Sequence, residues 1–177
     1  MEFRFGFLPA SWELILKEAN KGQSLDFSKI DLVSAAKSML RYGFKHIEIT
    51  LDVYYALPGV ITEETIDKFL ELKEKNNLSI SVHLPLWSLE PSSFNEHIRE
   101  ASVTSIIETI RLVEPLNPEV YVLHATGPLA AEYSRLPFPA KYKNVILQYM
   151  NGFAAESVEE IITATEINPK KLAIENI

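Results

Sequence analysis

Short apolar runs alternate with longer amphipathic stretches along this chain of 177 residues. The stretches repeat apolar residues every three or four positions, as helices do, and the runs are rich in β-branched residues, as strands are. The order is therefore strand then helix, repeated, with strands roughly 35 to 50 residues apart, which predicts a parallel sheet with right-handed crossovers. The predicted strands are Phe3–Leu8, His46–Thr50, Leu78–His83, Val120–His124 and Lys171–Glu175.

Helix signals fill the segments between these strands. Thr62 is followed by two glutamates, the arrangement that caps a helix start and favours acids in its first turn. A second strong helix begins near Asn95, and a third stretch contains Asn151-Gly152, a candidate point for a break or bend. The predicted helices are Trp12–Asn20, about Ser28–Arg41, Thr62–Asn77, Asn95 to before Pro115, and about Tyr142–Thr165.

The loops after the strands are long and contain Trp, Tyr, Pro and Gly, whereas those before the strands are short. They cover residues 51–61, 84–93 and 125–140. This asymmetry is typical of an α/β barrel whose active site lies at the carboxyl ends of its strands. Five strand–helix units are too few to close an eight-stranded barrel. We therefore expect one partial TIM-barrel domain over residues 1–177, and a natural protein that continues beyond Ile177.

Three strands each end on a side chain that can bind a metal: His83, His124 and Glu175. In a parallel α/β fold the carboxyl ends of the strands open onto one face, so these residues are expected to meet there. Two imidazoles and a carboxylate form a ligand set for zinc, manganese or iron. Taken singly, each histidine is more often a core or loop residue than a ligand; taken together, the three favour a metal site.

Other candidate site residues are supported by fewer sequence features. Glu48 either orients a ligand of the pocket or satisfies a neighbouring basic residue, and His46 lies on the same strand, nearer its start. Arg99 either reaches a substrate anion or braces the loop that follows the third strand. Trp87 and Tyr54, in loops at the carboxyl ends of strands, are candidates for an aromatic wall that binds substrate or simply covers the barrel mouth.

The amino-acid composition limits the classes of binding partner and ligand that we expect. The chain is 47% hydrophobic and carries a net charge of −7 without a Lys/Arg cluster, so nucleic acid is a disfavoured partner. It has no cysteine, which excludes disulfides and thiolate ligands. Neither a signal peptide nor an apolar run of the ~20 residues that span a bilayer is evident, so we expect a cytoplasmic protein without membrane contact.

In its strand-end residues His83, His124 and Glu175 and the motifs around them, the chain resembles the xylose isomerase-like TIM-barrel superfamily. This superfamily includes endonuclease IV and the sugar phosphate isomerases and epimerases. The final Ala173-Ile-Glu-Asn176 resembles a fifth-strand "x-E-N" motif, and Gly43–Glu48 resembles the second strand of the isomerase and epimerase branches. The "H-x-G" pattern departs by one residue, since two residues separate His124 from Gly127. The remaining matches are His83 with Pro85, and Asn95 with Arg99, Ser102 and Val103.

The resemblance implies a divalent-metal enzyme that isomerises or epimerises a small sugar-like or phosphorylated metabolite. His83, His124 and Glu175 would hold the metal, and Glu175 would act as acid or base. Glu48 is a further catalytic candidate, whereas the family's second acid–base group lies on a later strand, absent here. Zinc would favour the alternative, an endonuclease IV-like phosphoester hydrolase, whereas manganese or cobalt would favour isomerisation. A third hypothesis is a non-catalytic fragment, or a half-barrel that pairs with a second copy, because open edge strands invite pairing.

Overall fold

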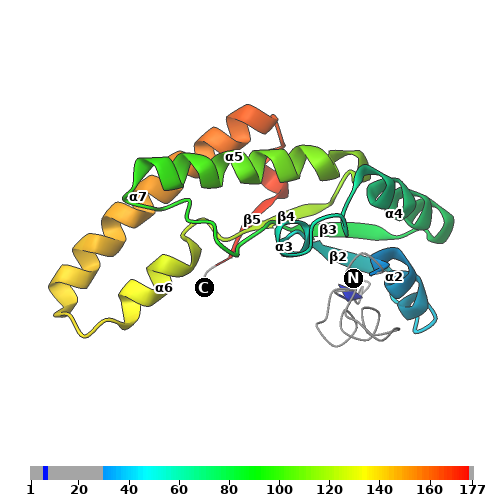
Figure 1. Cartoon of the computed structure of the whole chain (residues 1–177), viewed down its shortest axis with the longest axis horizontal. Coiled ribbons are helices and arrows are strands. Elements are labelled where there is room, and N and C mark those ends of the chain that lie inside the picture. The colour runs from blue at the N-terminus through cyan, green and yellow to red at the C-terminus, as the bar shows by residue number, and fades with distance from the viewer. Residues whose placement is uncertain (1–5, 8–29, 176–177) are drawn as a thin grey trace. The chain divides into compact units, whose positions relative to one another are not determined.

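The computed structural model describes residues 6–7 and 30–175. Within them a sheet has the strand order β1-β2-β3-β4-β5 (Figure 1). The first two pairs of strands are parallel, with Gly6 beside His46 and His46 beside Ser79. The α/β class and the parallel sheet are thereby confirmed. The strands are β1 (Gly6–Phe7), β2 (His46–Thr50), β3 (Ser79–His83), β4 (Val120–Leu123) and β5 (Leu172–Ile174).

Helices lie between the strands where the apolar periodicity predicts them. Thr62 caps α4, its hydroxyl accepting a hydrogen bond from the Thr65 N–H at 3.2 Å, and the helix ends at Asn77 in the left-handed conformation. This confirms the predicted start and end. The helices are α2 (Leu32–Leu40), α3 (Asp52–Ala56), α4 (Glu63–Asn76), α5 (Glu96–Val113), α6 (Gly127–Arg135) and α7 (Ala140–Thr165), with 3₁₀ turns η2 (Glu114–Leu116) and η3 (Pro169–Lys171).

Four details differ from the sequence-based expectations. The helix expected from Ser28 begins at Leu32, because the Asp31 carboxylate caps it by accepting from the Ser34 N–H at 2.9 Å. The predicted loops 51–61 and 125–140 contain the helices α3 and α6. The helix α7 runs unbroken through Asn151-Gly152. The helix predicted over residues 12–20 lies outside the described residues.

The chain divides into two compact units. The described part of the first comprises residues 6–7, 30–83 and 112–121, and that of the second comprises 84–111 and 122–175. The first unit buries Ile47, Ile49, Phe69, Ile80 and Val82, and the second buries Val103, Ile106, Ile110, Leu123 and Met150. The single partial domain over residues 1–177 stays a prediction.

Alternation along β2 determines which side chains are available for chemistry. Ile47 and Ile49 point into the first unit's core, while His46 and Glu48 lie on the opposite face of the strand and remain partly accessible. None of the helices in the described part of the chain has the length and apolar character required to span a lipid bilayer.

Candidate metal centre

Strand pairing places His124 beside Glu175 in the second unit. The Glu175 N–H donates to the Leu123 carbonyl at 3.0 Å, so the residues that follow β4 and β5 lie at the same level. The Nε2 of His124 is 3.3 Å from Oε2 of Glu175. The His124 side chain is only 9% exposed, whereas that of Glu175 is 55% exposed. A nearly buried imidazole thus faces a carboxylate that solvent or a ligand can reach.

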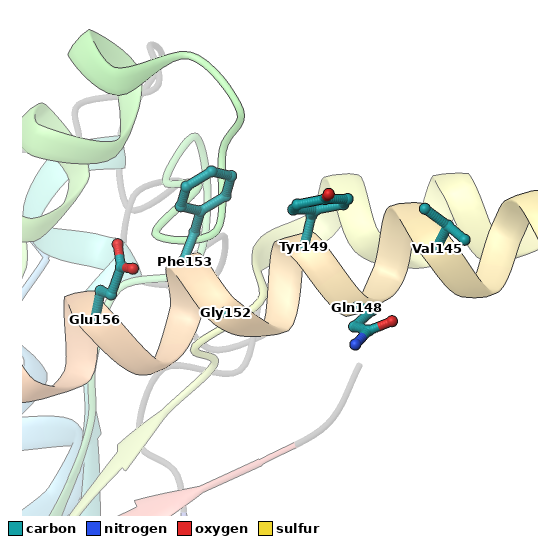
Figure 2. A pocket seen from close by; sticks show the side chains of 6 residues that line it. All are labelled: Val145, Gln148, Tyr149, Gly152, Phe153 and Glu156. Carbon is teal, nitrogen blue, oxygen red and sulfur yellow. The ribbon is translucent and has the colours of Figure 1, made fainter.

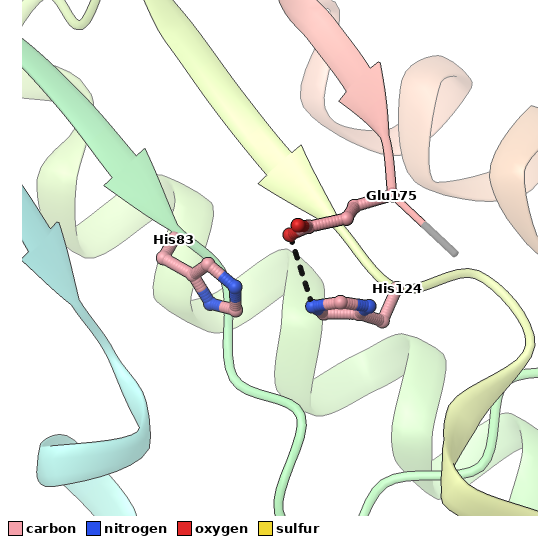
Figure 3. A group of neighbouring side chains, drawn as sticks. All are labelled: His83, His124 and Glu175. Atoms are coloured by element: carbon pink, nitrogen blue, oxygen red, sulfur yellow. Dashed lines mark ion pairs between the residues drawn. The ribbon is translucent and has the colours of Figure 1, made fainter. Parts of the chain in front are cut away.

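His83, the last residue of β3, is the third member of the group. The next residue, Leu84, donates its N–H to the Val122 carbonyl at 2.9 Å, so β3 ends beside β4. One ligand atom from each of His83, His124 and Glu175 lies within 4.8 Å of the others. Figure 3 shows the Glu175 side chain extending from the end of β5 toward both rings. The three residues that the sequence singled out therefore converge.

The chemistry of this group suits a divalent cation, and one of its separations has the expected length. Around a tetrahedral cation with bonds of about 2.1 Å, two ligand atoms are about 3.4 Å apart. The His124–Glu175 separation of 3.3 Å is close to that value, whereas separations in the group reach up to 4.8 Å, so the side chains would have to rotate closer together around a shared cation. Three protein ligands leave a position open for water or substrate, as in catalytic sites. The same separation would also suit a simple imidazole–carboxylate ion pair, so a binding measurement must distinguish the two.

Glu48 belongs to a hydrogen-bonded chain in the first unit. The Ser81 hydroxyl donates to Glu48 Oε2 at 2.9 Å, and Ser81 Oγ lies 2.9 Å from Nε2 of His46. Because Ser81 gives its one proton to Glu48, Nε2 of His46 must donate to Ser81. The other ring nitrogen lies 2.6 Å from the Ser79 hydroxyl. His46 and Glu48 thus share one face, and Glu48 is connected to a basic neighbour through Ser81.

The candidate substrate-binding residues belong to three different segments of the chain. Tyr54 lies in α3 of the first unit, half-buried, with its ring 5.0 Å from that of Tyr55 in an edge-on arrangement. Trp87 lies in the β3–α5 loop of the second unit and is exposed. Arg99 braces that same loop: its guanidinium donates to the Ser93 carbonyl at 2.8 Å and stacks over Phe153. Substrate binding by these three residues stays a prediction.

Glu90 is a residue that the sequence did not single out. Its Oε1 accepts a hydrogen bond from the Leu129 N–H at 2.8 Å, at the start of α6. Within the described residues its Oε2 is buried without a hydrogen-bond partner. Burial raises the pKa of the Glu90 carboxyl above its ordinary value of 4.5, and the bond from Leu129 only partly offsets this. The sequence signal was weak: a lone glutamate in a proline-containing loop.

The raised pKa of Glu90 makes a prediction about stability and pH. A carboxyl whose pKa is higher in the folded state stabilises the fold fully below its unfolded pKa and loses that contribution as pH rises through the folded pKa. We therefore expect Glu90→Gln to gain stability relative to wild type as pH rises from below 4.5 toward neutrality. Thermal unfolding of both metal-free proteins across this range measures the difference; a constant gap would contradict the prediction.

A separate hollow of about 530 Å³ lies along α7, lined by Val145, Gln148, Tyr149, Gly152, Phe153 and Glu156 (Figure 2). The rings of Tyr149 and Phe153 lie on the same side of the helix. Phe153 also contacts Phe94 edge-on at 6.0 Å. None of the predicted site residues lines this hollow, and its described lining offers one carboxylate and no histidine, so it is a poorer candidate for a metal centre than the strand ends.

The sequence of this α/β fold matches a known protein family. Residues 36–177 match the family model described as "Xylose isomerase-like TIM barrel". Since this match covers most of the sequence, the chain belongs to the xylose isomerase-like TIM barrel family. It is also 26% identical, over 156 residues, to an uncharacterised protein of Methanocaldococcus jannaschii, a match that covers 87% of this chain and 47% of the relative.

Solved structures agree on the fold. A D-tagatose 3-epimerase-like protein superposes with a TM-score of 0.61 at 20% identity, covering 98% of this chain and 52% of that one. The D-psicose 3-epimerase of Clostridium cellulolyticum H10, solved with D-tagatose, superposes with a TM-score of 0.65 at 15% identity, covering 97% and 51%. The chain thus spans about half the length of the relatives it matches, which agrees with the predicted incomplete barrel.

Proposed function

We propose that this chain supplies part of the active site of a divalent-metal-dependent isomerase or epimerase that acts on a small sugar-like or phosphorylated substrate. The observation that carries the proposal is the convergence of His83, His124 and Glu175, with ligand atoms within 4.8 Å of one another. Family membership supports it. The solved structures named as D-tagatose 3-epimerase-like and D-psicose 3-epimerase also support it, although at 20% and 15% identity their similarity shows the fold alone.

Each residue would have a distinct role. A bound divalent cation polarises a substrate carbonyl and an adjacent hydroxyl, which lowers the barrier to proton transfer between neighbouring carbons. His83 and His124 would hold the cation as neutral imidazoles. Glu175, the most exposed of the three, would ligate with one oxygen and exchange a proton with the substrate through the other. Glu48, which accepts a hydrogen bond from the Ser81 hydroxyl, remains a further candidate for acid–base chemistry.

Substrate would be bound by groups around the strand ends. Trp87 offers an exposed apolar ring for the face of a sugar, and Tyr54 offers a hydroxyl. Arg99 would act on substrate through the loop that it braces, or directly on an anionic group. The formal net charge of −7 does not disfavour a small neutral sugar as substrate, because binding such a molecule does not require a basic surface.

Deuterium exchange tests the proposal. The protein is incubated in heavy water with manganese or cobalt and either D-tagatose or D-fructose, and solvent deuterium at the carbon next to the carbonyl is measured. We expect incorporation, and a loss of at least about 100-fold in Glu175→Gln, because a positioned acid–base group contributes about 10²–10⁴-fold. His97→Ala, which changes an exposed histidine outside the candidate ligand group, is expected to match wild type.

Phosphoester hydrolysis is the second candidate, because two strand-end histidines and a carboxylate also suit a zinc site that activates water. The acidic charge and the absence of a basic cluster weigh against duplex DNA as its substrate. An abasic-site duplex incubated with zinc or manganese separates the two candidates. Strong nicking that depends on His83 would reverse the order of preference.

Self-association is a further proposal. Among the described residues the sheet ends at β5, and Ile174 on that strand is 53% exposed, so this edge has apolar surface to offer a second copy. The measured mass in solution tests it: a stable monomer of 20.1 kDa at high concentration would contradict pairing.

A further inference from the structure

Two loops of the second unit are fastened to each other by side chains from the β3–α5 loop. Glu90 Oε1 accepts from the Leu129 N–H at 2.8 Å, and the neighbouring Ser92 hydroxyl donates to the Thr126 carbonyl. The acceptor, Thr126, precedes α6 directly, and the donor, Leu129, lies in the first turn of that helix. The segment after His124 is thus bound at two points, one just before α6 and one at its start.

Glu90 replaces a cap that α6 lacks. The N-cap residue of this nine-residue helix, Thr126, makes no side-chain capping hydrogen bond. A helix start leaves N–H groups without intrahelical partners, and a carboxylate there satisfies one and interacts favourably with the helix dipole. Glu90 provides that carboxylate from 39 positions upstream of Leu129. Losing it would leave the start of α6 without this partner.

The backbone of Glu90 is itself held in place. The Glu90 N–H donates to the Ser102 hydroxyl at 2.8 Å, and Ser102 is 2% exposed in the first half of α5. The next residue, Pro91, has its carbonyl bonded by the buried Ser157 hydroxyl of α7 at 2.7 Å. The β3–α5 loop is thus anchored to two helices, so it can position a neighbouring loop.

Gly127 allows the Glu90 carboxyl to lie close to the backbone at the start of α6. It has a φ of +66°, and a Cβ there would collide with Glu90 Oε2 and lie 2.9 Å from the Leu89 carbonyl. The Glu90 carboxyl therefore packs directly against the backbone three residues beyond His124. Any displacement of that backbone would be transmitted to the imidazole, because only Ala125 and Thr126 intervene.

We infer that Glu90 is a positioning residue: its carboxyl holds the turn after His124 and thereby keeps that imidazole in line with Glu175. The inference rests on the proposed function, because it assigns Glu90 to the metal centre formed by His124. Groups that orient a ligand without touching the metal typically change metal affinity by about 10–100-fold when they are removed.

Cobalt binding and hydrogen exchange together test this role. We expect Glu90→Ala to lower cobalt affinity by about 10–100-fold, to change the visible absorption of bound cobalt, and to speed amide exchange over residues 125–131. Glu90→Gln keeps an acceptor for the Leu129 N–H and is expected to restore both affinity and spectrum. Glu132→Ala, which removes an exposed glutamate of the same helix, is the matched control and is expected to change neither.

The possible failures are distinguishable. If wild type binds cobalt and Glu90→Ala binds it equally well with an unchanged spectrum, the inference is wrong and the proposed function stands, even if exchange in α6 increases. If wild type binds no cobalt, the proposed function is wrong, and so is the role of Glu90 in positioning a metal ligand. If Glu90→Gln is as weak as Glu90→Ala, the acceptor at Leu129 is not what positions His124.

Discussion

Replacing any one of His83, His124 and Glu175 by alanine is expected to lower the affinity for zinc or cobalt by at least about 100-fold. Removing a group that only orients a ligand costs about 10–100-fold, and removing a ligand costs more. The three candidate ligand atoms lie within 4.8 Å of one another, so each variant would remove a donor from the same proposed cation. Titration calorimetry, or competition with a coloured chelator, measures the loss.

The matched control is His97→Ala. The His97 side chain is 92% exposed and only approaches Glu100, at 3.9 Å, so its removal is expected to leave metal affinity unchanged. The Glu175→Ala variant should also remain folded without metal, because the Glu175 side chain is 55% exposed and substitutions at exposed positions change stability little. Equal loss in His97→Ala, or tight binding that survives His83→Ala, would contradict a three-residue centre.

The convergence at the strand ends could be predicted because it depends only on topology. A residue that ends a parallel strand emerges at the same sheet edge as its neighbours, whatever the helices between them do. The runs ending at His83, His124 and before Glu175 were recognisable from apolar character alone. The sequence could not predict the distance of 3.3 Å between His124 and Glu175, which depends on register and side-chain rotamers.

Other features escaped prediction for identifiable reasons. The helices α3 and α6 are short and lie among proline and glycine, so periodicity carries little signal there. The helix α7 continues through Gly152 because Met150 and Ala154, two residues to either side, are buried, and such packing outweighs a propensity cost of about 1 kcal/mol. Glu90 bonds to a backbone N–H 39 residues away, a contact that no local pattern encodes.

Gly127→Ala is expected to lower the free energy of unfolding by about 2–4 kcal/mol. Part of the cost is conformational, because a φ of +66° is unfavourable for any residue with a Cβ. The remainder is steric, because the new methyl group meets the Glu90 carboxyl and the Leu89 carbonyl. Gly152→Ala is the matched control: nothing lies within 4 Å of its added Cβ, and in the middle of α7 alanine is expected to stabilise by about 0.5–1 kcal/mol. Denaturant unfolding measures both.

The double variant Gly127→Ala with Glu90→Ala separates the two causes. Truncating Glu90 removes the carboxyl from the path of the new methyl group, so the double variant is expected to lose less stability than the sum of the single variants. Part of the stability loss caused by Gly127→Ala should remain, because the Leu89 carbonyl at 2.9 Å and the positive φ do not depend on the Glu90 side chain. Strictly additive losses would show that the Glu90 side chain moves aside without cost, and that it does not hold the turn after His124. Full recovery would show instead that the backbone accepts alanine once the carboxyl has gone.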